Sequence, residues 1–193
     1  MDPAAQVDDC RDGVAQATSR LGVVFESRVF SVERVEVCDR DGVTRHRDLV
    51  RHPGAVTVVP ILADGSLVLI RNHRFTLRRW MVEFCAGKLE GAEDPAGAAL
   101  RELEEETGYR AGTIQALGAY YTSPGFCDEL MRVFVATDLT PVPARLEIGE
   151  EIEVFTATRA QIRAMIVDGT MEDGKSIAAF AKFELMMPED PVR

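Results

Sequence analysis

Four glutamates crowd the carboxyl end of one predicted helix, where negative charge is unfavourable. The helix is expected to begin after Asp94, whose side chain can cap the first turn, with Pro95 at its first position. Gly108 should end it, because glycine adopts the left-handed cap conformation without steric cost. Carboxylates are disfavoured here because the negative pole of the helix dipole lies at this end, and local rules broken in this way often mark functional sites. The four side chains are Glu102, Glu104, Glu105 and Glu106.

Three of these glutamates, Glu102, Glu105 and Glu106, share one helical face by their three- and four-residue spacing. Carboxylates that converge on one point suit a hard divalent cation such as Mg²⁺, which takes oxygen ligands. A solvated acidic face is the alternative, and it is the common explanation for an isolated Glu-rich turn. The helix by itself leaves both interpretations open.

The glutamates belong to a longer pattern that resembles the Nudix box. That pattern is Gly, five residues, Glu, seven residues, then Arg-Glu-apolar-any-Glu-Glu-any-Gly-apolar. This chain fills every fixed position, with an aromatic residue at the last one, where an aliphatic residue is usual. The matching residues are Gly87, Glu93, Arg101, Glu102, Leu103, Glu105, Glu106, Gly108 and Tyr109.

The resemblance covers roughly residues 50–185 and is strongest to the ADP-ribose (ADP-sugar) pyrophosphatase branch of the Nudix hydrolases. In that branch a proline stands about sixteen residues after the box, and Pro124 is in that position here. The segment His52–Val56 and Arg74 ahead of the box are also similar to that branch. The resemblance implies Mg²⁺-dependent cleavage of ADP-ribose to AMP and ribose 5-phosphate, with Mn²⁺ as a substitute metal.

Another short segment resembles different Nudix hydrolases. Phe84–Gly87 reads Phe-Cys-Ala-Gly, which is similar to enzymes for GDP-mannose and UDP-glucose, whereas ADP-ribose enzymes more often have Pro-Ala-Gly. A preference for GDP-mannose or UDP-glucose is therefore an alternative. Two others are the removal of oxidised nucleoside triphosphates and a non-catalytic nucleotide-binding module. The complete set of box carboxylates favours an enzyme over a binding module.

The resemblance also implies roles for single residues around the box. Metal ligands would be the carboxylates of Glu102, Glu105 and Glu106, with the main-chain carbonyl of Ala86. Arg101 precedes Glu105 by four residues and can hold its carboxylate in place. Glu93 would orient Arg101 or reach a metal through water. The catalytic residues expected here are Glu105, Glu150, Glu151 and Arg101.

The catalytic base is expected in an acidic loop late in the chain, by resemblance to this branch. The family often has an unbroken acidic run there, whereas Ile148 and Gly149 interrupt it in this sequence. We take Glu150 as the base, with Glu151 and Glu147 as alternatives. All three could instead be surface charges, because loops are polar by default.

Substrate contacts are predicted ahead of the box and after it. Arg74 lies in the basic cluster Arg71–Phe75, and a guanidinium group can bind phosphate oxygens through two parallel hydrogen bonds. The alternative for this cluster is a solvated loop. Trp80, the only tryptophan, is expected in the core rather than as a platform for a base. The predicted substrate-binding residues are Arg51, Arg74, Pro124, Gly125 and Phe126.

The composition limits the kinds of partner that the protein is expected to bind. A formal charge of −10 over 193 residues argues against general nucleic-acid binding, which needs a basic face. No apolar run is long enough to span a membrane, and the first residues lack the pattern of a signal peptide. Four widely spaced cysteines indicate neither a zinc site nor a disulfide framework, which favours a reducing cytoplasm. The expected partner is a small-molecule nucleoside diphosphate sugar.

Alternating strands and helices predict the α/β class, and the resemblance implies a Nudix α/β/α sandwich with a mixed sheet. Residues 1–20 read as a polar tail, either disordered or a frayed helix, 21–52 as an N-terminal β-hairpin arm, and 53–193 as the Nudix hydrolase domain. By resemblance, the arm would serve dimerisation in a homodimer that exchanges N-terminal strands. The clearest strands are expected at 55–60, 67–70, 114–121, 130–136 and 152–156, and further helices over 159–168 and 176–185.

Overall fold

The computed structural model describes residues 16–39, 42–146 and 149–188. They form two compact units. One contains the residues up to His52 together with Ser123–Glu129, and the other contains Pro53–Thr122 together with the residues from Leu130 onward. Within the described ranges, no helix is long and apolar enough to cross a membrane.

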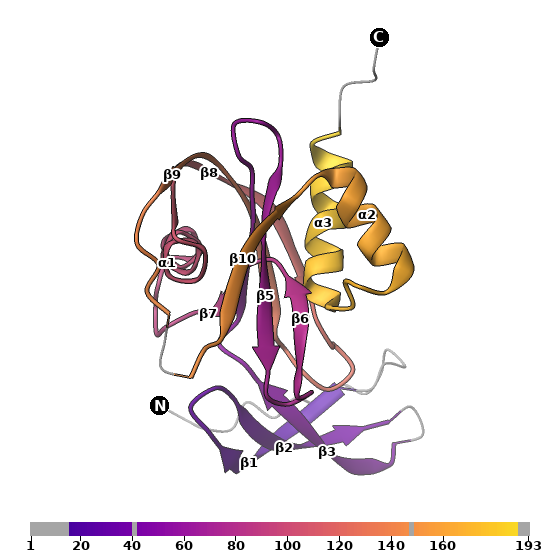
Figure 1. Ribbon diagram of the computed structural model, residues 1–193. Coiled ribbons are helices and arrows are strands. Elements are labelled where there is room, and N and C mark those ends of the chain that lie inside the picture. Colours follow the sequence, from indigo (N-terminus) through magenta and orange to yellow (C-terminus); the bar gives the residue numbers. More distant parts are fainter. Residues whose placement is uncertain (1–15, 40–41, 147–148, 189–193) are drawn as a thin grey trace. The chain divides into compact units, whose positions relative to one another are not determined.

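The first unit is built on an antiparallel three-stranded sheet (Figure 1). Its strands, in spatial order, are β1 (Gln16–Glu26), β2 (Ser31–Cys38) and β3 (Thr44–Arg51). The strand β1 begins at Gln16, so residues 16–20 of the predicted tail belong to a strand. Arg40 and Asp41 of the predicted hairpin turn lie outside the described residues, but the flanking Asp39 Oδ1 accepts a hydrogen bond from the Val43 N–H (2.9 Å).

The second unit contains two sheets and three helices (Figure 1). In the four-stranded sheet, β4 and β9 run parallel and the other neighbours antiparallel. Its spatial order is β7 (Ala86–Lys88), β4 (Ala55–Pro60), β9 (Leu130–Pro141) and β8 (Tyr109–Tyr121). The three-stranded sheet is β10 (Ile152–Ala157), β5 (Leu67–Arg74) and β6 (Arg79–Glu83). The helices are α1 (Pro95–Thr107), α2 (Arg159–Asp168) and α3 (Gly174–Met186).

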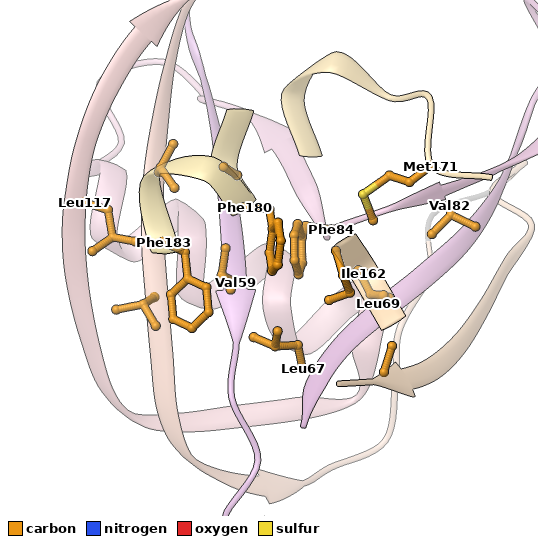
Figure 2. Packing of buried hydrophobic residues seen from close by; sticks show 14 residues of the cluster. Val59, Leu67, Leu69, Val82, Phe84, Leu117, Ile162, Met171, Phe180 and Phe183 are labelled. Carbon is orange, nitrogen blue, oxygen red and sulfur yellow. The ribbon is translucent and has the colours of Figure 1, made fainter. Parts of the chain in front are cut away.

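Two apolar clusters hold the helices to the sheets of this unit. Val56 and Val58 of β4 pack in a cluster with α1, while Val59 belongs to the other cluster, which includes residues of α2 and α3. Figure 2 shows Phe84 and Phe180 within this second cluster. Because neighbouring side chains of a strand point to opposite faces, β4 contributes to both clusters. The predicted α/β/α arrangement is confirmed, with α1 on one side and α2 and α3 on the other (Figure 1).

The predicted ends of α1 are confirmed. Asp94 Oδ2 accepts the Gly97 N–H (3.2 Å), and Gly108 has the left-handed φ of 69°. The capping box of α2 is also present, formed by Thr158 and Gln161. These features depend on neighbouring residues only, which is why the sequence reveals them.

Two predictions about the residues before the box were wrong. The strand β5 continues to Arg74, because it pairs with β6 and β10, so most of the basic cluster lies on a strand rather than in a loop. Trp80 is 44% exposed and packs edge-on against His73, with 5.5 Å between ring centroids. The two residues face each other across β5 and β6, so the ring is supported by this pair and not by the core.

Candidate active site

The carboxyl end of α1 is held rigidly because the helix buries one apolar side. Ala98, Ala99 and Leu103 are inaccessible to solvent and pack under the helix. Glu106 lies on the same buried side and is only 4% exposed. Its carboxylate accepts a hydrogen bond from the Ala86 N–H at 3.0 Å, which places the start of β7 against the last turn of α1.

Burial dominates the electrostatics of Glu106. Its pKa is raised to about 8, chiefly by loss of solvent and also by the nearby carboxylates of Glu102 and Glu150, while the Ala86 N–H and Arg74 act in the opposite direction. The pKa of Glu102 is also raised, first by burial, although Arg101 opposes this. Strongly shifted carboxylates that lie together are typical of functional sites.

Arg101 makes four hydrogen bonds to three carboxylates on the exposed side of α1. Its Nε and NH2 bind the two oxygens of Glu93 at 3.1 and 3.2 Å, and its NH1 donates to Glu102 (2.7 Å) and Glu105 (3.1 Å). The contact with Glu105 follows the four-residue spacing, whereas the contact with Glu102 is an addition. Arg101 lowers the pKa of Glu93, so this guanidinium keeps the outer carboxylate ionised.

Gly87 is the reason that Glu102 can lie against β7. A Cβ atom at residue 87 would be 1.8 Å from Glu102 Oε1 and 2.0 Å from its carboxyl carbon. Any side chain here would therefore displace the carboxylate. The glycine at the start of the box therefore leaves room for the Glu102 carboxylate in its present position.

The three helix carboxylates do not converge on one point. Glu102 and Glu105 share Arg101, while Glu106 faces Ala86, and the described residues contain no group of three acidic, His or Cys side chains arranged around a common metal position. The donor chemistry nevertheless fits a hard cation, since Glu102 is close enough to Glu106 to raise its pKa. A divalent cation would supply the positive charge that the buried Glu106 carboxylate lacks.

The acidic loop is anchored to α1 by main-chain hydrogen bonds. Val142 N–H donates to Gly108 O (2.8 Å), and Arg145 N–H donates to Glu105 O (3.0 Å). Beyond this anchor, Glu150 is partly buried and acts electrostatically on both Glu102 and Glu106. The structure therefore brings Glu150 to the carboxylates of α1.

The other two glutamates proposed for this loop are Glu151 and Glu147. Glu151 is exposed, and its main-chain carbonyl accepts the His73 N–H at 3.0 Å, which extends the pairing of β10 with β5. Glu147 lies outside the described residues. Of the three candidates for the base, Glu150 is the one with a described influence on the helix carboxylates.

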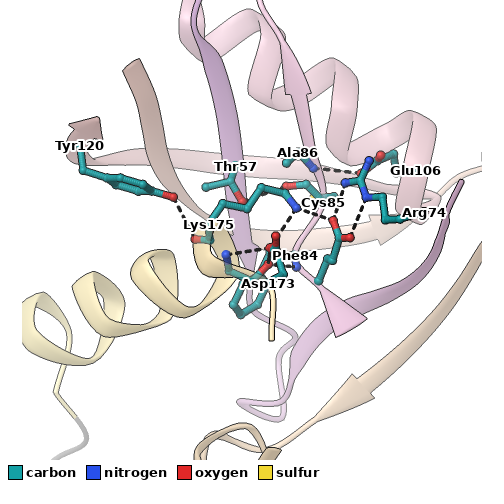
Figure 3. A network of polar contacts seen from close by, with 11 residues as sticks. Thr57, Arg74, Phe84, Cys85, Ala86, Glu106, Tyr120, Asp173 and Lys175 are labelled. Carbon is teal, nitrogen blue, oxygen red and sulfur yellow. Dashed lines mark hydrogen bonds and ion pairs between the residues drawn. The ribbon is translucent and has the colours of Figure 1, made fainter. Parts of the chain in front are cut away.

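Arg74 is placed beside Glu106 by the strand β5 (Figure 3). Its Nε and NH2 bind the two oxygens of Glu83 at 2.7 and 2.5 Å, and Glu83 is only 1% exposed. Lys175 of α3 binds the same carboxylate. Sequence reasoning missed the roles of Glu83 and Lys175 because 92 residues separate them and no local pattern joins them.

The remaining substrate-binding candidates belong to the first unit. Arg51 Nε donates to Glu33 (2.6 Å) and its NH1 to Asp128 (3.0 Å). The loop that carries Pro124 and Gly125 is exposed, and Phe126 O accepts the Val50 N–H at 2.8 Å. These contacts tie the loop to the end of β3, while the binding of substrate by its residues stays a prediction.

Known proteins resemble this chain over most of its length. The model of the NUDIX domain matches residues 51–180. ADP-ribose pyrophosphatase of Bacillus subtilis (strain 168) is 36% identical over 164 residues, 84% of this chain and 89% of the relative. The methanol dehydrogenase activator of Bacillus methanolicus is 36% identical over 172 residues, 88% of this chain and 93% of the relative.

A solved structure shares the fold as well. The crystal structure of an ADP compounds hydrolase superposes with a TM-score of 0.77 at 26% identity, and the match covers 90% of this chain and 96% of the other. The chain therefore belongs to the Nudix family, and it is a hydrolase that acts on phosphorus-containing anhydrides.

The raised pKa of Glu106 predicts an unusual effect of Glu106→Gln on stability. Its native pKa is about 8, whereas a glutamate in an unfolded chain titrates near about 4.3. The unfolded state therefore releases its proton first, and wild-type stability falls as pH rises through this window. In EDTA, we expect the substitution to raise the melting temperature, and to do so more at about pH 8 than at about pH 5.

Glu104→Gln is the matched control, because Arg110 lowers the pKa of Glu104 and the charged form is the stabilising one there. This control should not raise the melting temperature at either pH. A Glu106→Gln effect that is the same at both pH values would contradict the account of a buried, proton-binding carboxylate.

Proposed function

We propose that this protein is a Mg²⁺-dependent hydrolase that cleaves the diphosphate of ADP-ribose, or of related nucleoside diphosphate sugars, to a nucleoside monophosphate and a sugar phosphate. The observation that carries the proposal is the buried Glu106, which lies beside Glu102, Glu150 and Arg74. The resemblance to the Bacillus subtilis ADP-ribose pyrophosphatase over most of both chains supports ADP-ribose as the substrate. Mn²⁺ would be an adequate substitute, since it also accepts oxygen ligands.

Glu102 and Glu106 would hold the cation, with Glu105 and the Ala86 carbonyl as further ligands. When bound, the cation neutralises charge on the diphosphate and makes water a better nucleophile. Arg101 keeps Glu102 and Glu105 in place, as its hydrogen bonds to both carboxylates indicate. The side chains of α1 thus form the anionic wall of the site.

Hydrolysis needs a proton acceptor and a group that holds the diphosphate. Glu150 would take the proton of the attacking water, whose oxygen bonds to one phosphorus as the bridging P–O bond breaks. Arg74 would bind the diphosphate oxygens, because its position beside Glu106 sets it next to the carboxylate wall. For Arg51 and the loop residues Pro124, Gly125 and Phe126, the proposal of substrate binding rests on the resemblance alone.

The rival substrates are GDP-mannose and UDP-glucose, which the Cys85-Ala86 segment suggests by its resemblance to enzymes for these substrates. A non-catalytic module is not favoured, because every box carboxylate is present and the buried Glu106 lowers the stability of a metal-free fold at high pH. The Ser123–Phe126 loop favours ADP-ribose by its resemblance to that branch.

We also propose that the enzyme works as a homodimer in the cytoplasm. The strand β1 leaves Leu21, Val23 and Phe25 about half exposed, and an apolar strand of this kind favours pairing with a second copy. The free thiols of Cys85 and Cys127 suit a reducing compartment.

A comparison of substrates tests the proposed function directly. With Mg²⁺ present, the wild-type protein should turn over ADP-ribose with a higher kcat/KM than GDP-mannose or UDP-glucose, and EDTA should remove all three activities. Product analysis by ion-exchange chromatography should find AMP and ribose 5-phosphate in equal amounts. If ADP-ribose were the poorest of the three substrates, the assignment of the substrate would be wrong.

Substitution of the loop glutamates identifies the base. Glu150→Gln should lower kcat by about 100-fold or more, since general-base catalysis contributes roughly that much. Glu151→Gln is the matched control in the adjacent residue, and it should change kcat by less than about threefold, because exposed loop charges contribute little. Equal losses in both variants, or a loss confined to Glu151→Gln, would exclude Glu150 as the base.

A further inference from the structure

A buried ionic group on the far side of Arg74 has no part in the mechanism so far. Glu83 is only 1% exposed, and both of its oxygens receive hydrogen bonds from Arg74. Lys175 donates to one of the same oxygens, and Asp173 accepts from Lys175 at 2.9 Å. A buried carboxylate is costly unless cations compensate it, and these four side chains together carry no net charge.

The main chain at Lys175 is fixed from several directions at the start of α3 (Figure 3). Asp173 caps the helix by accepting the Ser176 N–H (2.9 Å), and Ser176 Oγ accepts the Phe84 N–H (2.8 Å). The Tyr120 hydroxyl donates to the Lys175 carbonyl at 3.1 Å. Lys175 is therefore a rigidly mounted cation, and its side chain is 15% exposed.

Arg74 still has donors to offer while it is bound to Glu83. Glu83 occupies the edge formed by Nε and NH2, and no hydrogen bond within the described residues engages NH1. The side chain is 39% exposed, so its outer edge reaches solvent. Because a guanidinium is a planar fork, a fixed Glu83 also fixes the direction in which this outer edge points.

We propose that Lys175 is a positioning residue for diphosphate recognition, which acts by holding Glu83 and thereby the plane of the Arg74 guanidinium. The inference rests on the proposed function, in which Arg74 binds the diphosphate. It assigns the first turn of α3 to substrate binding, although α3 lies on the opposite side of the sheets from α1 (Figure 1). Without Lys175, Glu83 would have one cation instead of two, and Arg74 would be drawn more tightly into neutralising it.

Kinetics of Lys175→Met test this role. We expect KM for ADP-ribose to rise by about tenfold while kcat changes by less than about threefold, because the pre-oriented donors are lost from substrate binding. Lys175→Arg keeps the charge and should recover most of the loss. Lys182→Met is the matched control on the same helix, where the lysine donates to Leu117 O (3.4 Å), and it should leave both parameters unchanged.

A double-mutant cycle separates positioning from general stability. In an Arg74→Met background, Lys175→Met should cause no further rise in KM, because the residue through which it acts is gone. Independent, multiplying losses would overturn the proposal. Should Lys175→Met fail to fold, Glu83→Gln replaces it: this change should raise KM by itself but cause no further rise in the Arg74→Met background, whereas a further rise there would overturn the proposal.

Calorimetric binding of ADP-ribose in EDTA keeps this test distinct from that of hydrolysis. One outcome is that the wild type binds ADP-ribose but does not hydrolyse it, while Lys175→Met binds it about tenfold more weakly. This outcome would defeat the proposed function but support the positioning role. If the wild type hydrolyses ADP-ribose and Lys175→Met binds it as tightly as the wild type does, the proposed function would be supported and the positioning role defeated. A wild type that neither binds nor hydrolyses the ligand would overturn both.

Discussion

The burial of the Glu106 carboxylate is the constraint on which the site depends. The apolar side of α1 packs Ala98, Ala99 and Leu103 beneath the helix, so Glu106 cannot turn outward without disturbing that contact. Its one hydrogen bond within the described part of the chain comes from the main chain of Ala86, and neighbouring carboxylates add repulsion. The fold thus holds a group whose charged form is unfavourable until positive charge arrives, and binding of a cation to the native state would recover that stability.

The two arginines of the candidate site are both bound to carboxylates other than Glu106. On the outer side, Arg101 is committed to Glu93, Glu102 and Glu105. On the inner side, Arg74 is committed to Glu83, which Lys175 also binds. Each arginine is therefore oriented by carboxylates before any ligand is present, and for Arg74, which we propose binds the diphosphate, this would lower the entropy cost of substrate binding. Under the proposal for Lys175, the same arrangement would make the first turn of α3 part of the site together with α1.

How well the sequence predicts these features depends on the distance between the residues involved. The ends of α1 were predictable because Asp94 and Gly108 act on adjacent main chain, and spacing within the helix predicts the contact of Arg101 with Glu105. Arg74 and Lys175 both bind Glu83, but Lys175 lies in a distant segment of the chain, so this contact was not predictable from the sequence. Trp80 was misplaced because its exposure is set by strand pairing with His73 rather than by its own hydrophobicity.

The most direct test of the account is a crystal structure of the Glu150→Gln variant with Mn²⁺ and ADP-ribose, read from the anomalous signal of the metal. The account predicts a manganese peak bound by Glu102 and Glu106 at the end of α1, with the diphosphate between the metal and Arg74. A metal and nucleotide bound elsewhere, with these two carboxylates unliganded, would contradict it.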